Sequence, residues 1–378
     1  MNILFIESSL DPTRGGVQRV TWVVSNFLKS KGYNIFFAFW FKDSSEVDKC
    51  YKIRIGNDGV ISKNCVGRLL DFVKINNIDL IIQQGRGKSL VDFLKRIKRE
   101  KICKIIYCLH LSPNYSDFNY NNSLRSILKN NLCKILYGID FSSLQEKIHY
   151  DLADRYVLLS ETFRDDFLQR TKIRDGSKLR WISNPLSFPL LTEEVEKRKY
   201  VLIISRMHEQ QKNLTTALRI WKELERRGHK DWKLLMGGYG PDEQMILNYA
   251  ASLGIERMSY VGKVENPIPL YRESSIFMMT SNYEGFGMVL TESLEFDCVP
   301  VAFDTFTALH DILTDGYNGY IIPEKDENMY VEKLETLMDN EQILHEMAQN
   351  CKDSCKKFTV ETIGKQWLKL IDELKNDI

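Results

Sequence analysis

Short apolar runs alternate with longer amphipathic stretches from one end of the chain to the other. The runs consist mainly of Val, Ile, Leu, Phe and Met, as parallel strands do when both faces of their sheet are buried. In the stretches between them, such as 17–31, 214–227 and 242–253, apolar residues recur at helical spacing. This alternation predicts an α/β protein built of doubly wound parallel sheets. Strands are expected at 3–6, 34–39, 80–82, 104–109 and 156–159, and then at 200–204, 233–236, 276–279, 299–303 and 319–322.

The alternation is interrupted in the middle of the chain. Asn184-Pro185 and Phe188-Pro189 are followed by the charged stretch 193–199, after which a new strand is expected. Two sheets joined by so short a linker would form a cleft between the carboxyl ends of their strands, where open α/β sheets bind ligands. We therefore expect a Rossmann-like domain at 1–190, a second at 191–360, and a final helix at 361–378 that packs back on the first domain.

Net charge is only +1, but it is unevenly distributed. Residues 1–184 hold 30 Lys and Arg against 19 Asp and Glu, whereas the remainder holds 22 against 32. A basic half suits a polyanion or an anionic membrane, although solvated surface lysines explain it equally well. A nucleic-acid binder is disfavoured, because helix-turn-helix and RNA-binding signatures are absent and the acidic half would have no role.

The cysteines and the apolar runs indicate the cellular compartment in which the protein is expected. The eight cysteines include no Cys-x-x-Cys pair, so their spacing fits neither a zinc site nor a disulfide framework. The first ten residues lack the basic start and the cleavage site of a signal peptide. The longest apolar run, 35–41, is far shorter than the roughly 20 residues that span a bilayer. We expect a cytoplasmic protein.

The strongest candidate site follows the strand expected at 276–279. Glu284 and Glu292 bracket a glycine-containing turn that leads into a helix. Glycines let backbone N–H groups approach a ligand, and a helix N-terminus favours negative charge, so a diphosphate suits this turn. Glu284 could orient sugar hydroxyl groups, and Glu292 could accept hydrogen bonds from a ribose diol. Alternatively, Glu284 is an ordinary turn residue and Glu292 a solvated helix residue. The residues expected to contact such a diphosphate ligand and its sugars are Glu284, Gly285, Phe286, Gly287, Met288, Val289 and Glu292.

Two cations follow the strand expected at 200–204. Arg206 can grip a phosphate with two hydrogen bonds, and Lys212 adds a point charge. In the plainer interpretation both are ordinary surface cations. Gly238 belongs to a glycine cluster after the next strand, where either close ligand approach or simple turn geometry would require it.

The N-terminal half offers two weaker candidates. Gly15 and Gly16 follow the first strand and precede a helix, like a phosphate-binding turn, but they lack the full Gly-x-Gly-x-x-Gly spacing. His110 follows the strand expected at 104–109, where it is either a polar catalytic group or a core histidine. We find no metal-ligand spacing, no Asp-x-Asp, no P-loop and no nucleophile elbow.

In this order, the motifs resemble the family-four retaining glycosyltransferases of the GT-B fold. The family's E-x7-E motif matches Glu284 and Glu292, its Arg–Lys diphosphate pair matches Arg206 and Lys212, and its N-domain glycine loop matches Gly15-Gly16. The segment 311–319 resembles E-I-x-x-D-G-x-N-G, with Asp311 replacing the first Glu, and Asn184-Pro185 stands where members carry an interdomain Asn-Pro. His110 aligns less securely with a histidine that recurs in relatives.

The resemblance implies hexosyl transfer from a nucleoside diphosphate sugar, most often a UDP-sugar, with retention at the anomeric carbon. The co-substrate is the sugar nucleotide; no cofactor and no metal are implied, and Arg206, Lys212 and backbone amides would neutralise the departing diphosphate. The acceptor implied is a glycan or lipid-linked glycan of a cell-surface polysaccharide such as capsule or lipopolysaccharide. The residues expected to act in catalysis are His110, Arg206, Lys212 and Glu284.

The basic half suggests a hypothesis of peripheral membrane contact. The stretches 86–104 and 123–136 interleave Lys and Arg with apolar residues and would suit peripheral contact with an anionic inner leaflet. Helices that pack on the core and expose a basic outer face explain the same pattern. Two rivals to transfer also stay open: a sugar-nucleotide epimerase of the same fold, and an inactive donor-binding or scaffold subunit of a transferase complex.

Overall fold

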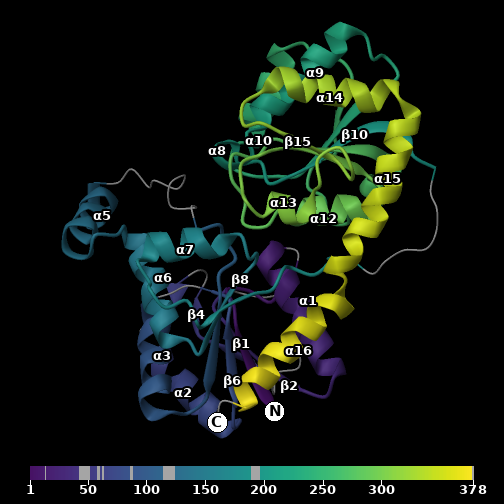
Figure 1. Ribbon diagram of the computed structural model, residues 1–378. Helices are drawn as coiled ribbons and strands as arrows, with labels where there is room; N and C mark the ends of the chain where they lie inside the picture. Colours follow the sequence, from purple (N-terminus) through teal and green to yellow (C-terminus); the bar gives the residue numbers. More distant parts are fainter. Residues whose placement is uncertain are drawn as a thin grey trace. The chain divides into compact units, whose positions relative to one another are not determined.

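The computed structural model describes residues 1–12, 14–41, 52–57, 60–61, 64–85, 88–113, 124–188 and 196–376. The chain forms two compact units, each described here by itself (Figure 1). The first comprises Met1–Ser187 and Thr359–Ile378, and the second Phe188–Phe358. The boundary expected between 190 and 191 lies outside the described residues.

The first unit is built on a seven-stranded parallel sheet with the order β3-β2-β1-β6-β7-β8-β9. The five strands predicted in this half are confirmed, because each is a run of buried apolar residues. Two edge strands were not predicted, since each has only three residues, of which Leu179 alone is buried. The strands are β1 Asn2–Ile6, β2 Asn34–Phe39, β3 Lys52–Arg54, β6 Leu80–Gln83, β7 Lys104–Cys108, β8 Arg155–Leu158 and β9 Leu179–Trp181, beside a small antiparallel pair, β4 Gly56–Asn57 and β5 Val60–Ile61.

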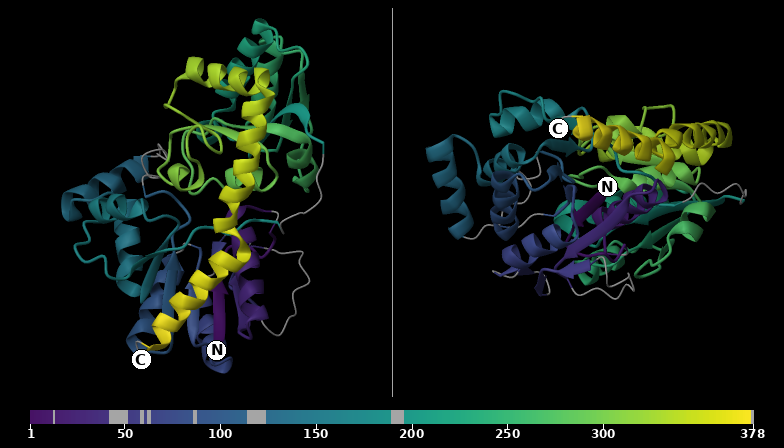
Figure 2. Two further views of the ribbon diagram at one scale, coloured as in Figure 1. Left: turned by 45° about the vertical axis from the view of Figure 1, so that its right-hand side comes forward. Right: turned by 90° about the horizontal axis from the view of Figure 1, so that it is seen from below.

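Helices cover both faces of this sheet, with α2, α3 and α6 on one side and α1 and α16 on the other (Figures 1 and 2). The last helix, α16, packs on α1, where Gly364 lies so close to Phe27 that a Cβ atom would stand 2.3 Å from its ring. An ion pair between Arg180 and Glu373, 2.9 Å long, ties α16 to β9. The helices are α1 Gly16–Ser30, α2 Cys65–Ile75, α3 Lys88–Glu100, α5 Leu124–Tyr137, α6 Phe141–Leu152, α7 Phe163–Thr171 and α16 Val360–Asn376.

The second unit is built on a six-stranded parallel sheet with the order β12-β11-β10-β13-β14-β15. Its strands are β10 Arg198–Ile204, β11 Lys233–Gly237, β12 Met258–Tyr260, β13 Ser274–Met279, β14 Val299–Phe303 and β15 Tyr320–Ile322. Figure 1 shows α9 and α14 over one face of this sheet and α12 and α13 over the other. The helices are α8 Glu209–Lys212, α9 Leu214–Arg227, α10 Glu243–Ser252, α11 Ile268–Glu273, α12 Met288–Glu295, α13 Leu309–Ile312, α14 Glu327–Asp339 and α15 Glu341–Cys355, followed by the 3₁₀ turn η2 Lys356–Phe358.

The predicted class, two doubly wound parallel sheets, is confirmed. Within the part of the chain that the structure describes, no helix combines the length and the apolar character needed to cross a bilayer.

Candidate functional site

Two loops lie side by side at the carboxyl edge of the second sheet. One follows β10 and the other follows β13, which is the neighbour of β10 in the sheet although the two are far apart in sequence. The loops are joined by the N–H of Asn282, which donates to the carbonyl of Gln211 at 2.8 Å, and by the hydroxyl of Thr280, which donates to the carbonyl of Asn213 at 3.0 Å. The sheet order therefore brings together two of the motifs predicted from sequence.

Lys212 and Glu284 face each other across these loops. Their Nζ and Oε1 atoms lie 2.5 Å apart, and the hydroxyl of Ser281 donates to the same carboxylate oxygen at 2.7 Å. The two charged side chains are only 15% and 9% exposed. An ammonium group has three donors and a carboxylate several acceptor positions, so both groups keep hydrogen-bonding capacity beyond this pair.

The pair lines a small pocket at the ends of β10 and β13. Ser205, Thr280 and Ser281 contribute hydroxyl groups to its wall, and Val289 comes from the first turn of α12. A small pocket with a few convergent polar groups is typical of a ligand site.

The first turn of α12 adds backbone donors beside this pocket. Gly287 precedes the helix with φ 79°, a left-handed conformation that disfavours other residues, and no side chain caps the helix. The N–H groups at the start of an uncapped helix attract an anion. Met288 and Val289 are half-buried there, whereas Phe286 is buried edge-on against Phe358 at 5.7 Å between ring centroids. The side chain of Phe286 is thus a packing group, and only its backbone is available to a donor.

Arg206 and Gly238 follow the ends of β10 and β11, as expected, but do not line this pocket. Arg206 is exposed after the end of β10 and does not line the pocket. Gly238 has φ 139°, and a Cβ atom there would stand 1.7 Å from the carbonyl oxygen of Ser205. The glycine is required because the loop after β11 packs directly on the backbone of the loop after β10.

The second carboxylate of the E-x7-E motif is buried. Glu292 is 4% exposed, accepts a hydrogen bond from the hydroxyl of Tyr271 at 3.1 Å, and does not line the pocket. One helical turn further on, Glu295 is also buried, and neither of its carboxylate oxygens has a hydrogen-bond partner among the described residues. Burial, together with the charge of Glu292, raises the pKa of Glu295 to about 8. Glu295 could not be singled out from the sequence, where it is one more polar residue of an amphipathic helix.

Gly15 and Gly16 begin helix α1 in the first unit. Gly15 is the N-cap residue, without a side-chain cap, and a Cβ atom there would stand 2.9 Å from Oε1 of Gln18. The amide of Gln18 donates to Glu7 at 2.9 Å. Glu7 directly follows β1, is 2% exposed, and also accepts hydrogen bonds from the N–H and the hydroxyl of Ser8, each at 2.6 Å. Burial raises the pKa of Glu7, a residue that the sequence analysis overlooked because a lone carboxylate carries no motif.

His110 lies two strands away at the same edge of this sheet. Its Nε2 atom forms a short hydrogen bond with the amide oxygen of Gln84, the residue after β6. Burial lowers the pKa of His110 to about 4, so the imidazole is neutral at pH 7. Because an amide oxygen only accepts, the proton of the neutral ring is assigned to Nε2, which leaves Nδ1 as an acceptor.

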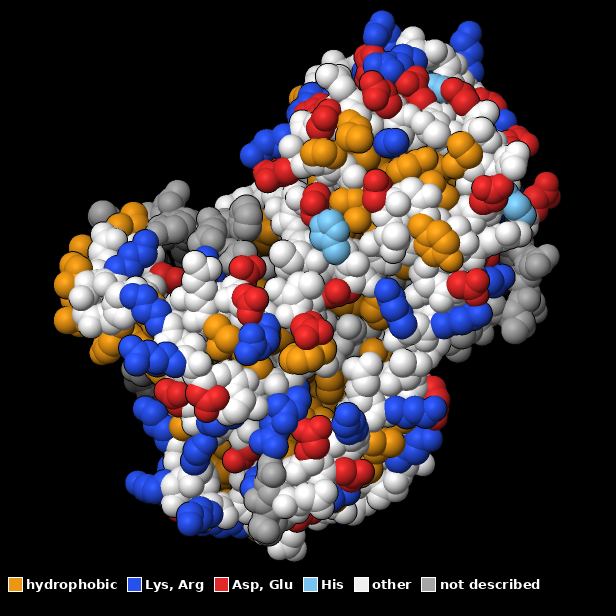
Figure 3. All heavy atoms as spheres, viewed as in Figure 1, with side chains coloured by type: hydrophobic (Ala, Val, Ile, Leu, Met, Phe, Trp, Pro, Cys, Tyr) orange, Lys and Arg blue, Asp and Glu red, His pale blue; other side chains and the backbone are white. Residues whose placement is uncertain are grey.

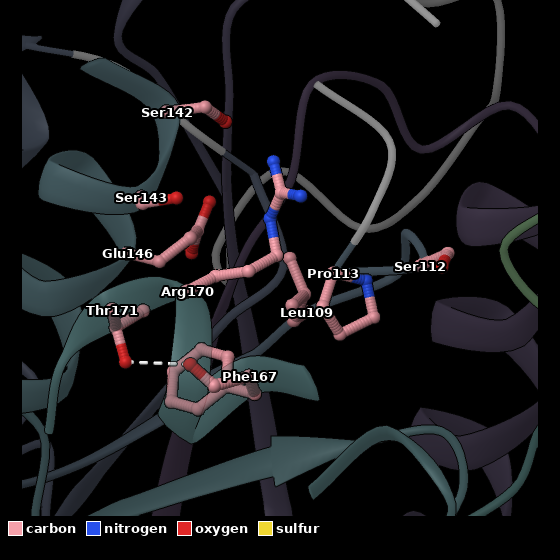
Figure 4. A pocket seen from close by; sticks show the side chains of 9 residues that line it. All are labelled: Leu109, Ser112, Pro113, Ser142, Ser143, Glu146, Phe167, Arg170 and Thr171. Carbon is pink, nitrogen blue, oxygen red and sulfur yellow. Dashed lines mark hydrogen bonds between the residues drawn. The ribbon is translucent and has the colours of Figure 1, made fainter. Parts of the chain in front are cut away.

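A second small pocket adjoins the segment after His110 (Figure 4). The carboxylate of Glu146 and the guanidinium of Arg170 lie close together in its wall, Glu146 being held by the hydroxyl of Tyr156 at 2.5 Å. The other lining residues are Leu109, Ser112, Pro113, Ser142, Ser143, Phe167 and Thr171. Among the described residues, no group of three or more His, Cys, Asp or Glu is arranged to hold a metal ion.

The predicted site residues thus fall into three sets. Lys212, Glu284 and Val289 line one pocket, with the backbone of 285–288 beside it. Arg206 is exposed near it, while Gly238 and Glu292 have structural contacts of their own. Gly15, Gly16 and His110 belong to the first unit.

Comparison with known proteins gives concordant results. Residues 192–357 match the family described as "Glycosyl transferases group 1". A Campylobacter jejuni enzyme named GalNAc-alpha-(1->4)-GalNAc-alpha-(1->3)-diNAcBac-PP-undecaprenol alpha-1,4-N-acetyl-D-galactosaminyltransferase is 28% identical over 236 residues, 61% of this chain and 63% of that protein. The amylovoran biosynthesis glycosyltransferase AmsD of Erwinia amylovora is 30% identical over 172 residues, 45% of this chain and 47% of that protein. The matches therefore span less than two thirds of these two relatives, whereas an uncharacterized Haemophilus influenzae glycosyltransferase, 23% identical, is spanned over 95% of its length and 93% of this chain.

Solved structures resemble the chain along nearly its whole length. The lipopolysaccharide outer core galactosyltransferase WaaB has a TM-score of 0.71 at 17% identity, with 99% of each chain covered. TarM has a TM-score of 0.76 at 13% identity, with 98% of each chain covered. Anabaena HepE, solved in complex with UDP, has a TM-score of 0.73 at 16% identity and covers 99% of this chain and 100% of its own. At these identities the likeness establishes the fold alone.

Proposed function

We propose that this chain, a GT-B glycosyltransferase whose residues 192–357 belong to the group 1 glycosyl transferases, moves a hexosyl group from a nucleoside diphosphate sugar to a glycan acceptor in bacterial polysaccharide synthesis. The observation that carries the proposal is the buried Lys212–Glu284 pair in a pocket beside the uncapped first turn of α12. This arrangement supplies a cation and backbone donors for a diphosphate, and a carboxylate for sugar hydroxyl groups.

The proposed reaction breaks the bond between the anomeric carbon and the diphosphate oxygen, and forms a bond from the same face to an acceptor oxygen. The acceptor proton passes to the departing diphosphate, so the configuration is retained. Negative charge grows on the leaving group, and Lys212 with the N–H groups of Met288 and Val289 would stabilise it. Glu284, fixed by Lys212 and Ser281, would hold the donor sugar in position for the reaction.

We propose UDP as the nucleotide and no metal requirement. Structural neighbours solved with UDP support the first point, since HepE and the pneumococcal transferase GtfA have the same fold. A metal is not needed in this proposal, because the diphosphate has other partners. Positive charge and N–H donors come from Lys212, the exposed Arg206 and the start of α12. An undiminished transfer rate in EDTA would support metal independence, and its loss would contradict it.

We also propose a lipid-linked acceptor and peripheral contact with an anionic membrane through α5. The relative from Campylobacter jejuni is named for an undecaprenol-linked substrate. On α5, Leu128, Leu132, Ile135 and Leu136 are 67%, 55%, 80% and 63% exposed, and Lys134 lies among them (Figure 3). Exposed apolar residues beside cations suit an anionic bilayer surface.

The other basic stretch has a different explanation. Helix α3 buries Leu90, Phe93, Leu94 and Ile97 completely. It exposes Lys95, Arg96, Lys98 and Arg99, so it is a core-packing helix with a basic outer face. Arg86, at the start of the stretch identified from sequence, lies outside the described residues, as does Ser123 before α5.

Thermal-shift measurements with UDP-, GDP- and ADP-sugars test the donor, because a ligand that binds only the folded state raises the melting temperature. We expect a UDP-sugar to stabilise the wild type and not Lys212→Ala. The surface variant Lys325→Ala is the control, since Lys325 is 83% exposed and forms its ion pair with the adjacent Glu324, away from the pocket residues. Stabilisation of Lys212→Ala equal to that of the wild type would contradict the proposed donor site.

Turnover measurements with and without an acceptor distinguish the two rival functions from glycosyl transfer. An epimerase would convert a sugar nucleotide without an acceptor, and a scaffold subunit would not turn over at all. The Lys212–Glu284 pair favours transfer over the scaffold function, because a degenerate site has no need of a buried charge pair.

A further inference from the structure

Lys212 is the last residue of α8, a single helical turn that lies between β10 and α9 in the chain. The next residue, Asn213, has a left-handed backbone with φ 50° and separates α8 from α9. A helix as short as α8 is not stable by itself in water. The position of the Lys212 side chain in the donor pocket therefore depends on the contacts that hold this turn.

The carboxylate of Glu209, the first residue of α8, caps the first turn of α9. It accepts hydrogen bonds from the N–H of Leu214 at 2.8 Å, from the N–H of Thr215 at 3.2 Å, and from the hydroxyl of Thr215. Asn213 is the N-cap residue of α9, but its side chain makes no capping hydrogen bond. Glu209 thus supplies the cap from the start of the preceding turn, and so ties α8 to α9 around Lys212.

The backbone of Glu209 is bonded as well. Its N–H donates to the carboxylate of Asp242, the N-cap residue of α10, at 2.8 Å. Its carbonyl accepts from the N–H of Asn213 at 2.8 Å. Glu209 therefore connects α8 with the beginnings of both α9 and α10.

The loop after β13 holds the carboxyl end of α8. The hydroxyl of Thr280 shares its proton between the carbonyls of Lys212, at 3.2 Å, and Asn213, at 3.0 Å. The last carbonyls of a helix have no partner within it, so this hydroxyl satisfies groups that α8 leaves open. Glu284 belongs to the same loop, so the segment that holds α8 also carries the ion-pair partner of Lys212.

We propose that Glu209 is a positioning residue of the donor site, which acts through Lys212 by capping α9. The inference rests on the proposed function, because it takes Lys212 as the cation that meets the donor diphosphate. Without the carboxylate of Glu209, the first N–H groups of α9 lose their partner and α8 loses its link to α9. A displacement of about 1 Å at a reacting centre can lower the rate about 100-fold, so a small shift of the ammonium group is enough.

The first measurement needs no substrate. The coupling free energy between Lys212 and Glu284 is obtained from denaturant unfolding of Lys212→Met, Glu284→Gln and the double variant, once with Glu209 and once with Glu209→Ala. We expect the coupling to fall by at least half when Glu209 is replaced. An equal coupling in the two backgrounds would overturn the proposal, because Lys212 would then reach Glu284 without the cap.

The second measurement is kinetic and uses the UDP-sugar that stabilises the wild type. Glu209→Ala should raise the donor KM by at least tenfold and lower kcat. In the Lys212→Ala background the same substitution should change neither value by more than twofold, because Glu209 acts through Lys212. Glu209→Gln keeps an acceptor oxygen for Leu214 and should recover part of the loss. Losses of the same size with and without Lys212 would rule this route out.

Asp326→Ala is the matched control. Asp326 caps α14 by accepting from the N–H of Met329 at 2.9 Å, and it does not line the donor pocket. Both this variant and Glu209→Ala should melt a few degrees earlier than the wild type, and only Glu209→Ala should change the donor KM. An equal rise in KM in the two variants would show that lost stability, and not positioning, is the cause.

Two further outcomes are covered by the design. If Glu209→Ala does not fold, Glu209→Gln is used in both measurements. Failure of the proposed function shows as an absence of transfer by the wild type itself, and the substrate-free coupling then decides the role of Glu209 alone.

Discussion

Lys212 and Glu284, 72 residues apart in the chain, form an ion pair of 2.5 Å between the loops that follow two adjacent strands. The pair fixes the pocket in which we place the donor diphosphate. It also leaves each partner dependent on the other, because an unpaired charge at such low exposure is strongly destabilising.

Lys212→Ala should lower kcat/KM by about 10²–10³-fold, since it removes a charge that stabilises the leaving group. It should also lower the free energy of unfolding by about 2–4 kcal/mol, because Glu284 is left buried without its partner. The double variant Lys212→Met with Glu284→Gln should regain most of the stability and none of the activity. Denaturant unfolding and initial rates measure the two effects. Recovery of activity in the double variant would contradict a role of the charges in transfer.

Gly238→Ala should prevent folding or lower the free energy of unfolding by more than about 3 kcal/mol, because its Cβ would overlap the carbonyl oxygen of Ser205 in a left-handed backbone. Gly262→Ala is the matched control, with φ 72° and nothing within 4 Å of the added atom. That variant should lose only about 1 kcal/mol, the usual cost of the conformation. Equal losses in the two variants would show that steric overlap is not the reason for Gly238.

Glu295 should make stability depend on pH. Burial raises its pKa to about 8 in the folded protein from 4.5 for an unperturbed glutamate, so the stability associated with it is fully present below pH 4.5 and is lost as pH rises towards 8. Glu295→Gln should therefore be more stable than the wild type at pH 8, by an amount on the order of 2–4 kcal/mol, and the gain should shrink towards pH 5. Denaturant unfolding at pH 5, 6.5 and 8 measures this. Glu332→Gln, at an exposed position of α14, should show no such trend.

His110 should stay neutral through the working range of pH. Because burial lowers its pKa to about 4 from 6.5, an NMR titration should show no protonation of this ring between pH 5 and 8. The sign for stability follows: the unfolded chain takes up the proton first, so the wild type should lose stability relative to His110→Gln as pH falls from 6.5 to 4. A midpoint near 6.5 in the folded protein would contradict the buried environment.

Substitutions on α5 should weaken membrane binding. Leu132→Asp with Ile135→Asp replaces two exposed apolar side chains by charges of the same sign as the lipid, and should abolish flotation with anionic vesicles. Ile75→Asp is the control, since Ile75 is 77% exposed on α2. Flotation should persist in the control and should decline with salt. Wild-type protein that stays unbound at low salt would remove the proposed contact.

Much of the fold could be predicted from the sequence. The strands at 34–39 and 299–303 were predicted with the bounds that the structure has, because their continuous apolar runs reflect burial on both faces of a sheet. The short strands β3, β9 and β12 were missed, since three residues, most of them not fully buried, leave no periodicity to detect. Lys212 and Glu284 were identified from motif spacing, and their roles in a donor site stay predictions.

The sequence by itself determined the longer strands and several of the helices, and it placed Lys212, Glu284 and His110 after strands, because local periodicity records which side of each element avoids water. Only the tertiary structure decided that β10 lies beside β13, that Gly238 is required by Ser205, and that Glu292 is buried against Tyr271. It also aligned Glu7, Gln84 and His110 at one sheet edge. These relationships depend on the order of strands in each sheet, which pairs residues distant in the chain and leaves no trace in local spacing.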